Sequence, residues 1–322
     1  MKHRPALAFA ALLLLIGVPM VVSPWFGWGS RPGEAVSLTV PPGASLGAVV
    51  AELDKAGLID AQRQFRILAR LFGDDAPVQA GRYALRKGDA WRTYLEMMQQ
   101  GKVVRLLVTI PEGMPSVLIA EKLAAEKRLS GPVKTPVEGS VLAETYEFSE
   151  GEPREAVLGR MQAAMLSALS ELWPRRTAAT AVSSPRETII LASIVEKETG
   201  KASERRRIAG VYSNRLRQGM KLDADPTVIY PITKGKPLGR RIRRSELNAD
   251  TGYNTYLKPG LPVGAIANPG RDSLAAVLDP EVHKFLYFVA DGTGGHVFAA
   301  SYAEHQANVA KWYALRRSRG EM

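Results

Sequence analysis

The chain has 322 residues, of which 46% are hydrophobic and 23% are charged, so it is long enough for two folded domains of ordinary composition. It contains no cysteine, which excludes disulfides, cysteine-ligated metals and cysteine nucleophiles. A formal net charge of +11 indicates acidic surroundings or partners, such as anionic lipid headgroups, an acidic polymer or nucleic acid.

Residues 6–22 form an uncharged apolar run long enough to cross a bilayer, at the short end of the range. Two basic residues precede it and three aromatic residues follow it where an interfacial belt is expected: Lys2 and Arg4, then Trp25, Phe26 and Trp28. A cleaved signal peptide is the alternative, but no small-x-small site ends the run. We therefore expect a single-pass inner-membrane anchor over residues 6–23, with residues 1–5 in the cytoplasm and the rest in the periplasm.

Residues 24–35 are rich in Gly and Pro and predict a linker. Beyond them, strand-like and helix-like stretches alternate: strands at 36–40, 81–85 and 103–110, and helices at 45–55, 64–72 and 91–100. These pieces predict a small α+β module over residues 36–110, in which nothing looks catalytic.

Residues 111–183 predict a connecting region with helices at 116–126 and 157–172 around a loop at 130–153. A domain over residues 184–322 follows, built around one central helix. Its later pieces are a helix at 209–216, an irregular stretch rich in Tyr, Asn and Gly over 217–270, a helix at 272–278, a hairpin between 285 and 300 and a terminal helix at 302–317. The predicted fold class is thus α+β. The basic runs at 205–207 and 240–244 lack interleaved aromatics, which argues against nucleic acid as a partner.

The central helix, residues 184–200, carries the main catalytic candidate. Successive residues turn by roughly 100°, so Glu198 shares the apolar face of Leu191, Ile194 and Val195, whereas Glu196 points away from it. A carboxylate on such a face is costly unless it is paired or works as an acid with a raised pKa. The alternative is a solvated helix end, because Glu is rarely buried.

The chain has no H-E-x-x-H, P-loop or G-x-S-x-G motif, and its four histidines are too scattered to assign to a metal. We therefore expect no metal and no cofactor. An acidic residue near loops rich in Tyr, Asn and Gly suits acid/base work on a neutral polar polymer such as a glycan. Glycosidases usually need two carboxylates, so a site with a single well-placed one must find its nucleophile in the substrate.

Several long motifs follow one another along the chain, over residues 191–199 (L-A-S-I-V-E-K-E-T), 214–230 (N-R-L-R-Q-G-M-K-L-D-A-D-P-T-V-I-Y), 253–256, 261–270 and 286–298. In this order they resemble the YceG-like family of membrane-anchored endolytic murein transglycosylases, and the match covers nearly the whole chain. The resemblance implies cleavage of the MurNAc–GlcNAc β-1,4 bond of nascent peptidoglycan, which leaves 1,6-anhydro-MurNAc ends and limits strand length. It also implies a LysM-like module over residues 36–110. The expected partners are glycan strands, membrane lipid and peptidoglycan synthases.

Other lytic transglycosylases carry their catalytic Glu before Ser or Thr, as Glu198 stands before Thr199. The resemblance and the helical wheel therefore both select Glu198 as the acid and then base, with Glu196 as runner-up. The flanking loops supply the predicted glycan-binding residues: Asp225, Thr227, Tyr230, Tyr253, Asn254, Tyr256 and Asn268.

The chain departs from the family pattern at two places. A run of Gly, aromatic, Leu, Phe, Pro, Asp, Thr and Tyr is replaced over residues 139–146, and Asp223-Ala224 replaces Gln-Ser/Thr before Asp225. The first departure keeps open an alternative function: an anchored, non-catalytic glycan-binding scaffold for cell-wall synthases.

Overall fold

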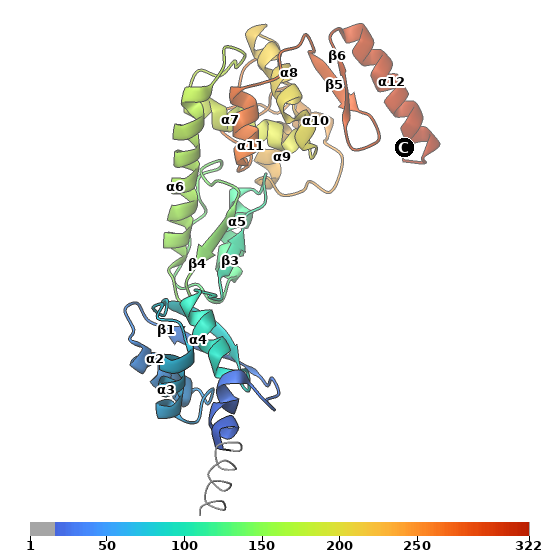
Figure 1. The fold of residues 1–322 in the computed structure, drawn as a ribbon. Helices are drawn as coiled ribbons and strands as arrows, with labels where there is room; N and C mark the ends of the chain where they lie inside the picture. The colour runs from blue at the N-terminus through green and yellow to red at the C-terminus, as the bar shows by residue number, and fades with distance from the viewer. Residues whose placement is uncertain (1–16, 322) are drawn as a thin grey trace, which may run out of the picture. The chain divides into compact units, whose positions relative to one another are not determined.

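The structure, a computed structural model, describes residues 17–321 (Figure 1). The chain divides between Arg105 and Leu106 into two compact units, called unit 1 and unit 2. Helices combine with three two-stranded antiparallel sheets in the described part of the chain, which confirms the predicted α+β class.

Most of the predicted membrane anchor, residues 6–16 of 6–23, lies outside the described residues. Residues 17–26 form a short helix. Within residues 17–321, no helix combines the length and the apolar character needed to cross a bilayer.

Unit 1 combines one two-stranded antiparallel sheet with three helices around a single core. Its strands are β1 (Ala35–Val40) and β2 (Gly81–Arg86), and its helices are α2 (Leu46–Lys55), α3 (Gln62–Phe72) and α4 (Trp91–Gln99). The strands pair from Ala35 with Arg86 to Val40 with Gly81. Because side chains alternate along a strand, Leu38 and Val40 enter the core.

The predicted linker over residues 24–35 is wrong, because the segment is bound into unit 1. Trp25 is 0% exposed and packs edge-on against Phe65, with 5.7 Å between ring centroids, so it is a core residue and no part of an interfacial belt. The Gly33 N–H donates to the Lys87 carbonyl at 2.6 Å, and the Lys87 N–H donates to the Glu34 carbonyl at 3.0 Å.

Unit 2 begins with a second antiparallel pair. β3 (Leu106–Thr109) had been predicted as the last strand of the small module, but it pairs with β4 (Thr145–Phe148) and belongs to unit 2. β4 lies in the stretch predicted as loop, and its Tyr146 and Phe148 face a core shared with α5 (Ser116–Ala125) and α6 (Arg154–Leu172).

The rest of unit 2 is built around the central helix, α7 (Pro185–Glu198), which packs on α8 (Arg205–Arg217), α9 (Asp225–Thr233) and α11 (Arg271–Leu278). The stretch predicted as irregular contains α9 and a short α10 (Arg244–Leu247). Leu142, Met165 and Leu169 join the core around α7, so the predicted connecting region is part of this unit.

Five further elements complete unit 2. Two short 3-10 turns cover Trp173–Arg175 and Ala202–Glu204. The predicted hairpin is confirmed as β5 (Tyr287–Ala290) with β6 (His296–Ala299), and the terminal helix α12 (Tyr302–Ser318) packs against both strands.

Candidate active site

Glu198 is the last residue of α7. Ser184 caps the helix by accepting the Glu187 N–H at 3.2 Å, and Pro185 takes the first helical position. The helix ends two residues earlier than predicted because Thr199 is extended, and its Oγ1 accepts the Lys201 N–H at 2.9 Å. Leu191, Ile194 and Val195 are fully buried, as the helical wheel predicts, and their face carries Glu198 to the edge of the core.

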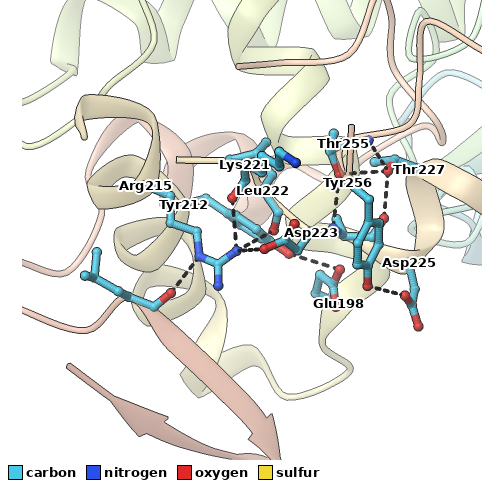
Figure 2. A network of polar contacts seen from close by, with 12 residues as sticks. Glu198, Tyr212, Arg215, Lys221, Leu222, Asp223, Asp225, Thr227, Thr255 and Tyr256 are labelled. Atoms are coloured by element: carbon cyan, nitrogen blue, oxygen red, sulfur yellow. Dashed lines mark hydrogen bonds and ion pairs between the residues drawn. The ribbon is translucent and has the colours of Figure 1, made fainter. Parts of the chain in front are cut away.

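Tyr212 of α8 holds the carboxyl of Glu198 (Figure 2). Its phenol O–H donates to Glu198 Oε1 at 3.0 Å, and its ring meets Phe288 edge to face, with centroids 5.9 Å apart. The ring is almost completely buried, so the donor has no freedom to turn elsewhere. Sequence reasoning missed Tyr212, because a tyrosine in an apolar helical run reads as an ordinary core residue.

The pKa of Glu198 is raised to about 7, chiefly because burial penalises the ionised carboxylate. The negative charge of Asp225 raises this pKa further, whereas the Tyr212 hydrogen bond and the Arg215 charge lower it. The C-terminal end of α7 adds its own negative dipole beside the carboxylate. Near neutral pH the group can therefore both donate and accept a proton.

Arg215 fixes the loop that leads from α8 to α9. It is nearly buried and donates to the carbonyls of Lys221 and Leu222 at 3.0 Å each, to Asp223 Oδ2 at 2.9 Å and to the Leu286 carbonyl at 2.6 Å. Asp223 has a φ of +51°, a left-handed conformation that Asp tolerates better than most residues. Asp223, which departs from the family pattern, is thus held in place by Arg215 in this chain.

Asp225 and Tyr256, both predicted site residues, lie beside Glu198 (Figure 2). The Tyr256 O–H donates to Asp225 Oδ1 at 2.6 Å. Burial, followed by the hydrogen bond and charge of Asp225, raises the pKa of Tyr256, so its phenol stays protonated as a donor. Glu198 therefore has a second carboxylate as a neighbour.

Thr227 and Asn254 do not line a groove as predicted, because both are buried and hold loops together. Thr227 Oγ1 donates to the Ala224 carbonyl at 2.7 Å and lies 2.9 Å from Thr255 Oγ1. The Asn254 amide donates to the Leu247 carbonyl at 2.8 Å and to two neighbouring carbonyls. These contacts place the start of α9, and with it Asp225, against the loop that carries Tyr256.

Tyr230 and Tyr253 lie together in a cavity of about 380 Å³ whose lining does not include Glu198. Their ring centroids are 4.9 Å apart, and Glu138, Ser140 and Arg186 also line the cavity. Glu138 was missed by sequence reasoning, and its pKa is raised, mainly by burial. The structure thus gathers only part of the predicted set around Glu198.

Asn268 is 0% exposed, so its prediction as a groove residue is wrong for this structure. Its Oδ1 accepts the Val141 N–H at 2.9 Å, and its amide donates to the Met114 carbonyl at 3.0 Å, Ser116 Oγ at 3.0 Å and Glu138 Oε1 at 2.9 Å. The side chain joins three segments that are distant in sequence.

The runner-up, Glu196, is buried and paired, not solvated. Its side chain is 4% exposed, accepts the Gly270 N–H at 3.0 Å and pairs with Arg205 at 3.4 Å. Arg205 also binds Glu112 and Asp272. Each carboxylate oxygen of Glu196 thus has a protein partner, and the bond to Gly270 holds the loop before α11.

Within residues 17–321, no three His, Asp or Glu side chains are grouped so as to hold a metal ion. The groups around Glu198 are instead those of acid/base chemistry: a carboxyl that titrates near neutrality, a fixed phenol donor and a nearby carboxylate held by a second phenol.

Known proteins resemble the chain over most of its length. Residues 38–311 match the model of the YceG-like family. The chain is 27% identical to an endolytic murein transglycosylase of Bacillus subtilis, covering 88% of this chain and 86% of that protein. It is 30% identical to one of Streptococcus pneumoniae D39, covering 86% of this chain but 58% of that longer protein. The crystal structure of a YceG-like protein from Listeria monocytogenes aligns with a TM-score of 0.52 at 26% identity, over 85% of this chain and 98% of that one. The chain belongs to the YceG-like family.

Proposed function

We propose that the protein is an endolytic murein transglycosylase. It cleaves the MurNAc–GlcNAc β-1,4 bond of nascent peptidoglycan, leaves 1,6-anhydro-MurNAc ends and so limits glycan strand length. The observation that carries the proposal is the Glu198 carboxyl, whose pKa is raised to about 7 and which Tyr212 holds beside Asp225. The names of the Bacillus and Streptococcus relatives support the same activity.

In the proposed reaction, protonated Glu198 donates its proton to the glycosidic oxygen as the bond from C1 of MurNAc breaks. Positive charge develops at C1, and the Asp225 carboxylate, held by Tyr256, stabilises it. The Glu198 carboxylate then takes the proton of the substrate's own C6 hydroxyl, whose oxygen bonds to C1 and closes the anhydro ring. No water is consumed, and Glu198 ends protonated as it began.

The decisive experiment compares Glu198→Gln with the wild type on isolated glycan strands, with mass spectrometry of the products. The variant should lose about 10² to 10⁴-fold in cleavage rate. Glu196→Gln is the matched control on the same helix, and at a temperature where its folding is verified it should keep most of the activity. An inactive Glu196→Gln beside an active Glu198→Gln would overturn the assignment.

The same products separate the competing functions. Anhydro ends support the transglycosylase, whereas reducing ends indicate a hydrolase. Glycan binding without any cleavage by the wild type would favour the scaffold, which the departure over residues 139–146 keeps open. In this structure those residues are used for folding, because Val141, Leu142 and Ala143 are buried in the cores of unit 2.

We also propose that the protein is a single-pass inner-membrane protein whose unit 2 lies in the periplasm. The apolar run at residues 6–22, with Lys2 and Arg4 before it, supports this topology. Unit 1 would then be the LysM-like module, and membrane-bound peptidoglycan synthases, which make the nascent strand, would be neighbours. A reporter fused after Met322 should be active only on the periplasmic side, and cytoplasmic activity would contradict the topology.

A further inference from the structure

One flank of unit 1 combines exposed apolar, aromatic and arginine side chains next to the end of the apolar run. We propose that this flank, formed by α3 with Phe26 and Trp28, lies in the headgroup layer of an anionic bilayer. The proposal rests on the membrane anchoring proposed above and goes beyond it, because it states which face of the folded unit meets the lipid.

The first step is that the helix over residues 17–26 is fixed to α3. The Gln64 side-chain amide donates to the Val21 carbonyl at 2.5 Å, and the rings of Phe26 and Phe72 meet edge to face at 5.6 Å. Contacts near both ends show that the two helices lie side by side. Since Trp25 is also built into the core, the end of the apolar run cannot move away from α3 without disrupting unit 1.

The second step is the depth at which α3 lies. The apolar run ends at residue 22, so Val21 marks the edge of the hydrocarbon layer. From Val21 to Phe26 the helix rises about 7.5 Å at 1.5 Å per residue. The headgroup region of a bilayer is about 5–8 Å thick on each side. The stretch of α3 between Gln64 and Phe72 therefore spans this layer.

The third step is the chemistry of the exposed side chains. Ile67 is 51% exposed and Leu71 67%, and the three arginines of α3 are exposed beside them: Arg63, Arg66 and Arg70. The helix contains no acidic residue, and across residues 17–321 none of these arginines has a carboxylate partner. Apolar groups interleaved with arginine are typical of a helix at a lipid interface, where each basic residue is attracted to anionic headgroups.

Aromatic residues extend the same flank. Phe26 stacks on Trp28 with 5.2 Å between centroids, and Trp28 is 59% exposed. Such rings favour the headgroup level of a bilayer. A cavity of about 910 Å³ borders α3 and is lined by its arginines, Ile67 and Leu71, together with Asp74 and Asp75.

The test uses the absence of cysteine from the chain. A single cysteine at Ile67 carries a nitroxide spin label in the full chain, reconstituted into bilayers that contain phosphatidylglycerol. The control is Ala84→Cys on β2, an exposed position on the face of the sheet away from the core. Electron paramagnetic resonance measures collisions of each label with oxygen, which concentrates in lipid, and with a water-soluble nickel chelate.

The label at Ile67 should show a several-fold higher oxygen-to-nickel ratio than the label at Ala84. The ratio should fall when Arg63, Arg66 and Arg70 are all replaced by Gln, or when the bilayer is neutral phosphatidylcholine. A water-exposed Ile67 label in protein that floats with the vesicles overturns the proposal and leaves the anchor standing. Protein that does not float overturns both. A label shielded from both reagents indicates a covering protein copy instead of lipid, which also overturns it.

Discussion

At the scale of single residues, the proton on Glu198 decides when cleavage can start. Because its pKa is raised to about 7, the acid form predominates below that pH and decreases about tenfold for each pH unit above it. The base that acts later is the carboxylate left by the first step, so Glu198 imposes no acidic limit. We expect kcat/KM for strand cleavage to show one alkaline limb with a midpoint near pH 7. A profile that rises through pH 7 would contradict the role of Glu198 as the acid.

Two neighbours of Glu198 should move that limb in opposite directions. Tyr212→Phe removes a hydrogen bond that lowers the pKa, so the limb should shift to higher pH. Asp225→Asn removes a negative charge that raises the pKa, so the limb should shift to lower pH. Both changes should also slow cleavage, because Glu198 loses its orienting donor in one variant and the developing charge loses its carboxylate in the other.

The matched control for these shifts is Tyr146→Phe, whose hydroxyl donates to the Leu142 carbonyl at 2.7 Å within the other core of unit 2. It should leave the pH profile unchanged even if it lowers stability. Shifts of Tyr212→Phe and Asp225→Asn in the same direction would show that the two groups do not act on the proton of Glu198.

At the scale of elements, amphipathic pattern alone located most helices and strands. α2, α3 and α4 were predictable because their apolar residues recur with helical spacing and Gly or Ser mark their ends. α9 was missed, because Pro226, Pro231 and β-branched residues argue against a helix. Tertiary hydrogen bonds from Thr227 hold it instead, and a sequence does not display those contacts.

The candidate site was predictable to the same limited extent. Glu198 could be selected because a carboxylate on an apolar helix face needs an explanation. Tyr212 could not, since nothing distinguishes its phenol from that of a packed core tyrosine. Thr227, Asn254 and Asn268 were misassigned for a related reason: polar residue type does not separate a side chain that binds a ligand from one that satisfies buried backbone groups.

The start of α9 offers a test at this scale. Thr227→Val keeps the shape of the side chain but removes the buried hydroxyl that donates to the Ala224 carbonyl, pairs with Thr255 Oγ1 and accepts the Thr255 N–H at 3.3 Å. Because that N–H loses its acceptor, the free energy of unfolding should fall by about 1–3 kcal/mol. Cleavage should slow as well, because Asp225 begins the same helix. Thr109→Val is the control, since its hydroxyl pairs with Thr145 at an exposed position and should matter by less than about 0.5 kcal/mol. Equal urea midpoints for the two variants would contradict this role of Thr227.

At the scale of the whole molecule, unit 2 is closed by a contact between segments more than a hundred residues apart. Asn268 joins the start of α5, the loop at residues 137–141 and the loop before α11 through four hydrogen bonds. Its amide donates to Glu138 Oε1 at 2.9 Å, so a neutral donor faces the buried carboxyl of Glu138. Unit 1 has its own core and takes no part in this junction.

Asn268→Asp should therefore destabilise unit 2 selectively. The new carboxylate would face Glu138 in a buried site, and an uncompensated buried charge costs about 3–5 kcal/mol. Because the pKa of Glu138 is already raised by burial, the repulsion between the two carboxylates is full above that pKa. It is lost as the pH falls through that pKa, so acidification should restore stability.

The double variant Glu138→Gln with Asn268→Asp exchanges amide and carboxyl and should recover part of the lost stability at neutral pH. Hydrogen exchange followed by mass spectrometry should show lost protection around β3, β4 and α11, with unit 1 unchanged. Uniform loss of protection across both units, or no recovery in the double variant, would show that Asn268 does not close unit 2 in this way.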